Sequence, residues 1–99
     1  MTTKAEKEHM GRVAALGCIV CYNNGYEGTP AACHHLLDKK AMGKRSSHFE
    51  VLPLCGIHHQ YGDGSENYQG EIAVHYSKKR FEEKYGTERE LLQQVLNML

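Results

Sequence analysis

The sequence contains no long apolar run. None of its 99 residues belongs to a stretch of about 18 consecutive apolar residues, the length that a membrane-spanning helix needs. Residues 1–8 also lack the apolar core of a signal peptide. We therefore expect a protein that does not enter a membrane and that resides in the cytoplasm.

Net charge is absent as well. Twelve basic side chains are balanced by twelve acidic ones, so the formal charge is zero. This balance argues against binding of nucleic acid by bulk electrostatic attraction. Local patches are still compatible with it, and the clearest contains four cations and no acid: Lys39, Lys40, Lys44 and Arg45. Taken alone, such a run is equally typical of a solvated surface loop.

Cysteines are few, and in a cytoplasmic protein they are more typical of a metal site than of disulfides. The sequence has four of them. In a reducing compartment thiols stay free, so metal ligation explains these cysteines better than a disulfide framework does. A chain of this length buries enough apolar surface for only marginal stability. A structural metal would therefore contribute meaningfully to folding.

Two short motifs have the spacing of zinc ligands. Cys18 and Cys21 form a C-x2-C pair, and Cys55 and His58 form a C-x2-H pair. Four protein ligands of these types are typical of a closed, tetrahedral structural zinc site. We predict that these four residues bind Zn²⁺.

Cys33 offers an alternative fourth ligand. If Cys33 replaced His58, the site would contain four cysteines and every histidine would be released for other roles. Alternation along a strand places Cys33 and His35 on one face and His34 on the other. This pattern modestly favours the set with His58, and Cys33 is then a small buried apolar residue.

The histidines include two adjacent pairs, His34-His35 and His58-His59. Neighbouring side chains diverge on a strand and are about 100° apart on a helix, so the two members of each pair need different roles. One histidine can bind a metal while its neighbour does something else. Imidazole titrates near neutral pH, and a divalent ion can offset charge on a phosphoryl oxygen, so phosphodiester hydrolysis fits this division.

Local patterns predict an α+β protein. A capping box opens a helix over about the first fifteen residues. Residues 31–37 and 49–54 are compatible with two strands that form a hairpin. Residues 56–61 can begin a helix, which the glycine-containing segment 62–67 interrupts.

Two helices are predicted in the last quarter of the chain. The first begins after Ser77 and ends at Gly86, and the second occupies about residues 88–98. The second helix carries an apolar stripe made of Leu91, Leu92, Val95, Leu96 and Leu99. We interpret this stripe as core packing, with a homodimer seam as the alternative.

Together these motifs resemble the HNH endonucleases, the ββα-metal or His-Me finger nucleases, and they are most similar to the small phage recombination-enhancement nucleases. The likeness runs from Cys18 to about Gly86. It is carried by Ala32-Cys33-His34-His35-Leu36-Leu37, Val51-Leu52-Pro53-Leu54-Cys55-Gly56-Ile57-His58-His59 and Lys79-Arg80-Phe81-Glu82-Glu83-Lys84-Tyr85-Gly86. The resemblance implies one zinc-stabilised ββα-metal domain over residues 1–99, with a metal core at about 18–86 and flanking terminal helices.

The resemblance also implies roles for individual histidines. His34 and His59 would bind a catalytic divalent ion, Mg²⁺, Mn²⁺ or Zn²⁺, and His35 would be the general base. His58 would close the zinc site. A loop could return His75 as a third ligand of the catalytic ion, and the alternative for His75 is a surface or capping role.

One position departs from the family pattern. Many members have an asparagine that orients the general base, whereas this chain has Ser46-Ser47-His48-Phe49-Glu50 in that region. Either His48 or Glu50 is therefore the candidate orienting residue.

The function implied by the resemblance is metal-dependent endonucleolytic hydrolysis of DNA in phage-type recombination or DNA processing. The protein would act in the host cytosol if a phage encodes it, with a recombinase filament or another replication or recombination protein as a partner. The cations Lys39, Lys40, Lys44 and Arg45 would contact DNA phosphates, and the oligomeric state is open. The alternative is a non-catalytic zinc module that binds nucleic acid or protein, which would leave His34, His35 and His59 without a role.

Overall fold

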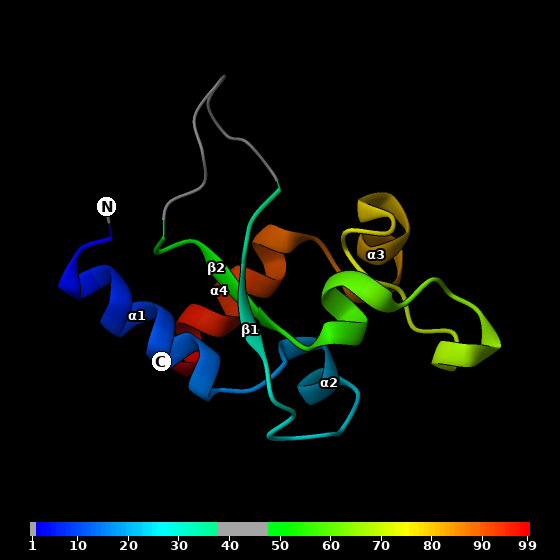
Figure 1. Cartoon of the computed structure of the whole chain (residues 1–99), viewed down its shortest axis with the longest axis horizontal. Coiled ribbons are helices and arrows are strands. Elements are labelled where there is room, and N and C mark those ends of the chain that lie inside the picture. The colour runs from blue at the N-terminus through cyan, green and yellow to red at the C-terminus, as the bar shows by residue number, and fades with distance from the viewer. Residues whose placement is uncertain (1, 38–47) are drawn as a thin grey trace.

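The computed structural model of the chain describes residues 2–37 and 48–99. In this part of the chain, a two-stranded antiparallel sheet is flanked by helices (Figure 1), as the predicted α+β class requires. The predicted DNA-contacting cations lie outside the described residues: Lys39, Lys40, Lys44 and Arg45. None of the described helices is long and apolar enough to cross a membrane.

The sheet is a short hairpin at the centre of the molecule. Strand β1 (Ala32–His35) pairs with strand β2 (Val51–Leu54), and His34 lies opposite Leu52. Both strands are shorter than the predicted 31–37 and 49–54. All four residues of β2 are buried, and helices α1, α2 and α4 pack against this strand.

The amino-terminal helix α1 (Lys4–Ala15) forms as its capping box predicts. The hydroxyl oxygen of Thr3 accepts a hydrogen bond from the backbone N–H of Glu6, and the Glu6 carboxylate accepts one from the N–H of Thr3. The chain leaves the helix at Gly17, whose φ of +80° favours glycine. Val13 is fully buried and anchors α1 in the core.

Two short elements flank the hairpin. Helix α2 (Ile19–Asn23) carries the C-x2-C pair, and at its N-cap the Cys18 sulfur accepts a hydrogen bond from the Cys21 N–H. After β2 the chain forms η1 (Ile57–Tyr61), a single π-helical turn. Such turns are frequent at functional sites. A one-turn 3-10 helix, η2 (Glu66–Tyr68), follows and overlaps the end of the segment 62–67 that was predicted to interrupt a longer helix.

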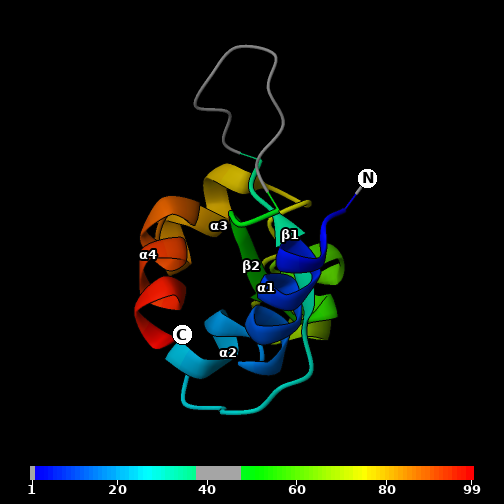
Figure 2. The same ribbon diagram turned by 90° about the vertical axis from the view of Figure 1, so that its left-hand side faces the viewer.

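The last two helices, α3 (Lys78–Tyr85) and α4 (Glu88–Met98), agree closely with prediction. In Figure 2, α4 lies beside the hairpin, and it contacts β2. Three members of the predicted apolar stripe, Leu91, Leu92 and Val95, are buried in the same cluster as β2. Core packing therefore explains most of the stripe.

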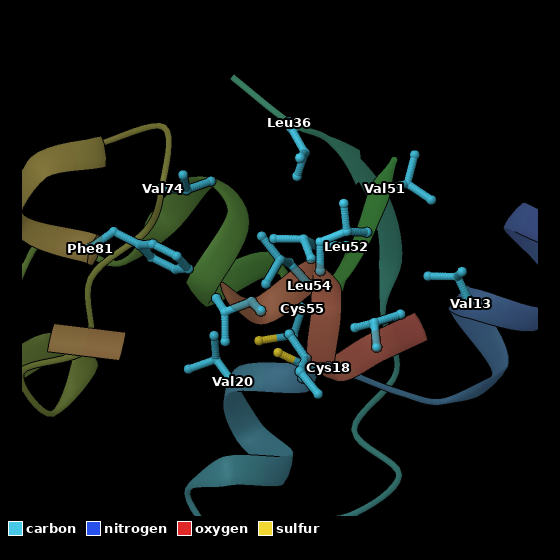
Figure 3. Close-up of a cluster of buried hydrophobic side chains, with 14 of the residues drawn as sticks. Val13, Cys18, Val20, Leu36, Val51, Leu52, Leu54, Cys55, Val74 and Phe81 are labelled. Carbon is cyan, nitrogen blue, oxygen red and sulfur yellow. The ribbon is translucent and has the colours of Figure 1, made fainter. Parts of the chain in front are cut away.

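One apolar core joins these elements. Figure 3 shows Val51, Leu52 and Leu54 of the hairpin surrounded by side chains from α1, α2 and α3. The sulfur atoms of Cys18 and Cys55 lie close together at the edge of this core. The hairpin thus brings two motifs that are far apart in the sequence to one place.

Candidate metal centres

The four predicted zinc ligands come together in the structure. Ligand atoms of Cys18, Cys21, Cys55 and His58 all lie within 4.8 Å of one another. The sulfur atoms of Cys21 and Cys55 are 3.7 Å apart. Nδ1 of His58 lies 3.6, 3.6 and 3.2 Å from the sulfur atoms of Cys18, Cys21 and Cys55, respectively.

These separations fit a zinc ion. Zinc–sulfur bonds of about 2.3 Å and a zinc–nitrogen bond of about 2.0–2.1 Å, arranged as a tetrahedron, place two sulfurs about 3.8 Å apart and a sulfur and a nitrogen about 3.6 Å apart. Burial raises the pKa of Cys18, and burial together with the neighbouring Cys18 thiolate raises the pKa of Cys21 to about 12. Thiolates at this place need a cation, which Zn²⁺ would supply.

Cys33 lies in a different environment. Its thiol donates a hydrogen bond to the backbone carbonyl of Met10 in α1, with an S–O distance of 3.2 Å. The group that could hold an ion contains His58 instead of Cys33. The geometry thus favours the set that was preferred from the sequence over the four-cysteine alternative.

The second ring nitrogen of His58 is held by a residue that sequence reasoning missed. Nε2 lies 2.7 Å from a carboxylate oxygen of Glu71, and this carboxylate also pairs with Lys84. Partial burial by itself raises the pKa of Glu71, but the hydrogen bonds from His58 and Lys84 outweigh it, and the pKa is lowered. An ionised Glu71 fixes the imidazole with Nδ1 toward the cysteines.

Three histidines form a second cluster. Ligand atoms of His34, His59 and His75 lie within 4.8 Å of one another. The Nε2 atoms of His59 and His75 are 3.1 Å apart. Two nitrogens bound to one ion at about 2.1 Å would be about 3.0–3.4 Å apart in octahedral or tetrahedral geometry, so this donor set fits a divalent metal.

His75 reaches this cluster because the chain folds back after η1. Asp63 pairs with Ile72, and the N–H of Val74 donates to the carbonyl of His58 at 2.9 Å. The return is tight at Gly62, where a Cβ atom would lie 2.7 Å from the carbonyl oxygen of Glu71. The interruption of the predicted helix is thus the feature that places His75 beside His59.

His34 is anchored by a second carboxylate that was missed from the sequence. His34 and Glu88 are 2% and 0% exposed, respectively, and Nε2 of the histidine lies 2.8 Å from Oε2 of the glutamate. The backbone N–H of Leu37 donates to the same carboxylate. A glutamate in the first turn of a helix is expected at the surface, where its negative charge interacts favourably with the helix dipole. No local pattern in the sequence therefore marks Glu88 as buried.

His35, the predicted general base, lies at the exposed end of the hairpin. Its Nε2 is 2.7 Å from Nδ1 of His48. Glu50, the other candidate orienting residue, forms an ion pair with Arg89 of α4. Partial burial, followed by the charges of His48 and His34, lowers the pKa of His35, which favours a neutral imidazole that can accept a proton.

The two clusters share their supporting elements. His58 and His59 are consecutive on η1, and one belongs to each cluster. His34 and His35 are consecutive on β1, and His34 belongs to the histidine cluster while His35 contacts His48. The two members of each pair therefore have different surroundings, as strand and helix geometry predicts.

Comparison with known proteins relates the chain to a described family. No curated protein matches the chain significantly. The sequence model of the family described as "Recombination enhancement, RecA-dependent nuclease" matches residues 2–99. A nuclease acts on nucleic acid, and the name of this family connects that activity to recombination. The chain therefore belongs to the family of recombination-enhancement, RecA-dependent nucleases.

Proposed function

We propose that this protein is an HNH-type, metal-dependent endonuclease that hydrolyses phosphodiester bonds of DNA. The observation that carries the proposal is the histidine cluster, whose member His34 directly precedes His35 of the His35–His48 pair on β1. Three imidazoles leave coordination positions for water or substrate, which is typical of a catalytic metal site, whereas the Cys18 site has four ligands and is typical of a structural one. The hairpin and η1 correspond, in this proposal, to the ββα-metal core.

Each group has a distinct role in the proposed reaction. His34, His59 and His75 would hold the divalent ion, which would supply positive charge to offset that of the phosphate and of the leaving oxygen. His35 accepts the proton of the attacking water through the ring nitrogen that does not face His48. His48 orients the His35 ring in the place of the asparagine found in many HNH nucleases.

The proposed substrate is DNA bound by a recombinase filament. The family description names RecA dependence, and zero net charge leaves the protein without a strong general attraction for nucleic acid. A partner that presents the DNA would compensate for this. From the sequence, we further propose that Lys39, Lys40, Lys44 and Arg45 contact phosphates.

Replacement of His35 tests the assignment of the general base. In His35→Ala, cleavage of DNA in a RecA filament should fall about 10²–10⁴-fold, because no side chain then accepts the proton of the water. The measurement is the rate of strand cleavage with Mg²⁺ or Mn²⁺. The zinc content and the thermal melting curve should stay unchanged.

Glu83→Ala, which alters an exposed residue of α3, is the matched control and should cleave at the wild-type rate. Cleavage by His35→Ala at the wild-type rate would remove the general-base role. Absence of cleavage by the wild-type protein, with RecA and with every divalent ion tried, would favour the non-catalytic zinc module instead.

A further inference from the structure

We propose that Glu88 is the positioning residue of the histidine metal centre. Its carboxylate engages Nε2 of His34 and leaves Nδ1 as the ring nitrogen available to an ion. This inference rests on the proposed function, since it assumes that His34, His59 and His75 bind a metal. It adds a residue from α4, which lies outside the sequence motifs that carry the resemblance.

The burial of Glu88 requires a strong reason. A carboxylate without access to water is unfavourable unless hydrogen bonds and a cation or cation-like group compensate it. Glu88 is fully buried, and two of its partners come from β1 and the residues that follow it: Nε2 of His34 at 2.8 Å, and the N–H of Leu37 at 3.0 and 3.1 Å from the two carboxylate oxygens. One carboxylate therefore fixes both the side chain of His34 and the backbone that follows it.

The position of Glu88 is itself well defined. It is the first residue of α4, directly after Thr87, whose side chain and that of Glu90 form a capping box. The backbone N–H of Glu88 donates to the carboxylate of Glu82 in α3 at 3.0 Å. The carboxylate of Glu88 is thus carried by a capped helix start that is also hydrogen-bonded to α3.

The arrangement repeats the one at the cysteine-containing centre. There, Glu71 engages Nε2 of His58 while Nδ1 faces the sulfur atoms. A carboxylate on the distal nitrogen of a ligating histidine fixes the ring orientation and raises the basicity of the ligand. Each centre therefore has one histidine held by one glutamate, and in both cases the glutamate comes from a part of the chain outside the hairpin and η1.

Glu88→Gln separates this role from a merely structural one. The glutamine keeps the shape and one oxygen that can accept from His34 and Leu37, so the contact between α4 and β1 is retained, while the negative charge is lost. Titration of the zinc-loaded protein with Co²⁺, followed by the visible absorption of the bound ion, measures the affinity of the second centre. We expect the Kd for this Co²⁺ to rise about 10–100-fold, with the zinc content unchanged.

Two control variants make the readout specific. Glu71→Gln should weaken retention of zinc and leave the Co²⁺ affinity of the second centre near that of the wild type, because Glu71 contacts His58. Glu83→Gln, at an exposed position of α3, should change neither. Should Glu88→Gln fail to fold, Glu88→Asp decides the question, since it keeps the charge but withdraws it from His34 and should also weaken Co²⁺ binding.

The outcomes distinguish the two proposals. If the wild-type protein binds a second Co²⁺ and a folded Glu88 variant binds it equally tightly, the positioning role of Glu88 is overturned and the proposed nuclease site is unaffected. If the zinc-loaded wild-type protein binds no second Co²⁺, the proposed catalytic centre fails, and the inference about Glu88 fails with it.

Discussion

Single side chains decide which atoms are available at each centre. An imidazole has two nitrogens, and a hydrogen bond to one of them determines which can face an ion. Glu71 does this for His58, and Glu88 does it for His34. A hydrogen bond likewise determines the direction of the Cys33 thiol, which donates to the carbonyl of Met10 in α1.

The choice between His58 and Cys33 as the fourth zinc ligand is testable by substitution. His58→Ala should lower zinc occupancy markedly, because it removes the nitrogen that lies within 3.6 Å of three sulfurs. Cys33→Ala should retain the zinc. Substitution with Co²⁺ and measurement of the thiolate-to-cobalt absorption in the near ultraviolet reports on the cysteine-containing centre alone. The opposite order of occupancy would favour the four-cysteine site.

Whole elements determine how the centres are supported. η1 supplies consecutive histidines to two clusters, and the fold-back after Gly62 supplies His75. Helix α4 covers β2 with Leu91, Leu92 and Val95 while its first residue, Glu88, reaches His34. The packing of α4 and the position of His34 are therefore expected to depend on each other.

Two leucines of α4 test whether its stripe is core or dimer seam. Leu91 is 3% exposed and Leu96 is 42% exposed. Leu91→Ala should lower the free energy of unfolding by about 2–5 kcal/mol, because it leaves a cavity in the core. Leu96→Ala should change it by only about 0.5 kcal/mol. Urea unfolding measures both values, and a change of oligomeric state in Leu96→Ala during sedimentation would instead indicate a seam.

At the scale of the whole molecule, the proposed zinc joins segments that are distant in sequence. Cys18 and Cys21 belong to α2 and its cap, Cys55 follows β2, and His58 lies on η1. The hairpin itself has two strands of four residues each. Since an isolated hairpin is at best marginally stable in water, the ion and the helices together are expected to maintain the fold.

Removal of zinc should therefore unfold the protein. Binding of a structural zinc ion contributes about 10–16 kcal/mol in zinc-finger peptides, which is comparable to the total stability of a small domain, about 5–15 kcal/mol. Circular dichroism melts before and after chelation should show loss of the cooperative transition, and addition of Zn²⁺, but not of Mg²⁺, should restore it. An unchanged melt of verified zinc-free protein would show that the core is sufficient alone.

The sequence by itself determined the helices, the hairpin and the residues of the cysteine-containing centre. Capping boxes, glycine stops and x2 spacings act over a few residues, so they can be read without the tertiary structure. The family resemblance added the interpretation of His34, His35 and His59.

Only the tertiary structure decided the positions of His75, His48 and Glu88, because these positions depend on contacts between segments that are distant in the sequence. It placed His75 beside His59 through the fold-back at Gly62, placed His48 against His35 while Glu50 paired with Arg89, and buried Glu88 against His34. A buried charge has no local pattern, since its stability comes from partners that are 51 and 54 positions away in the sequence.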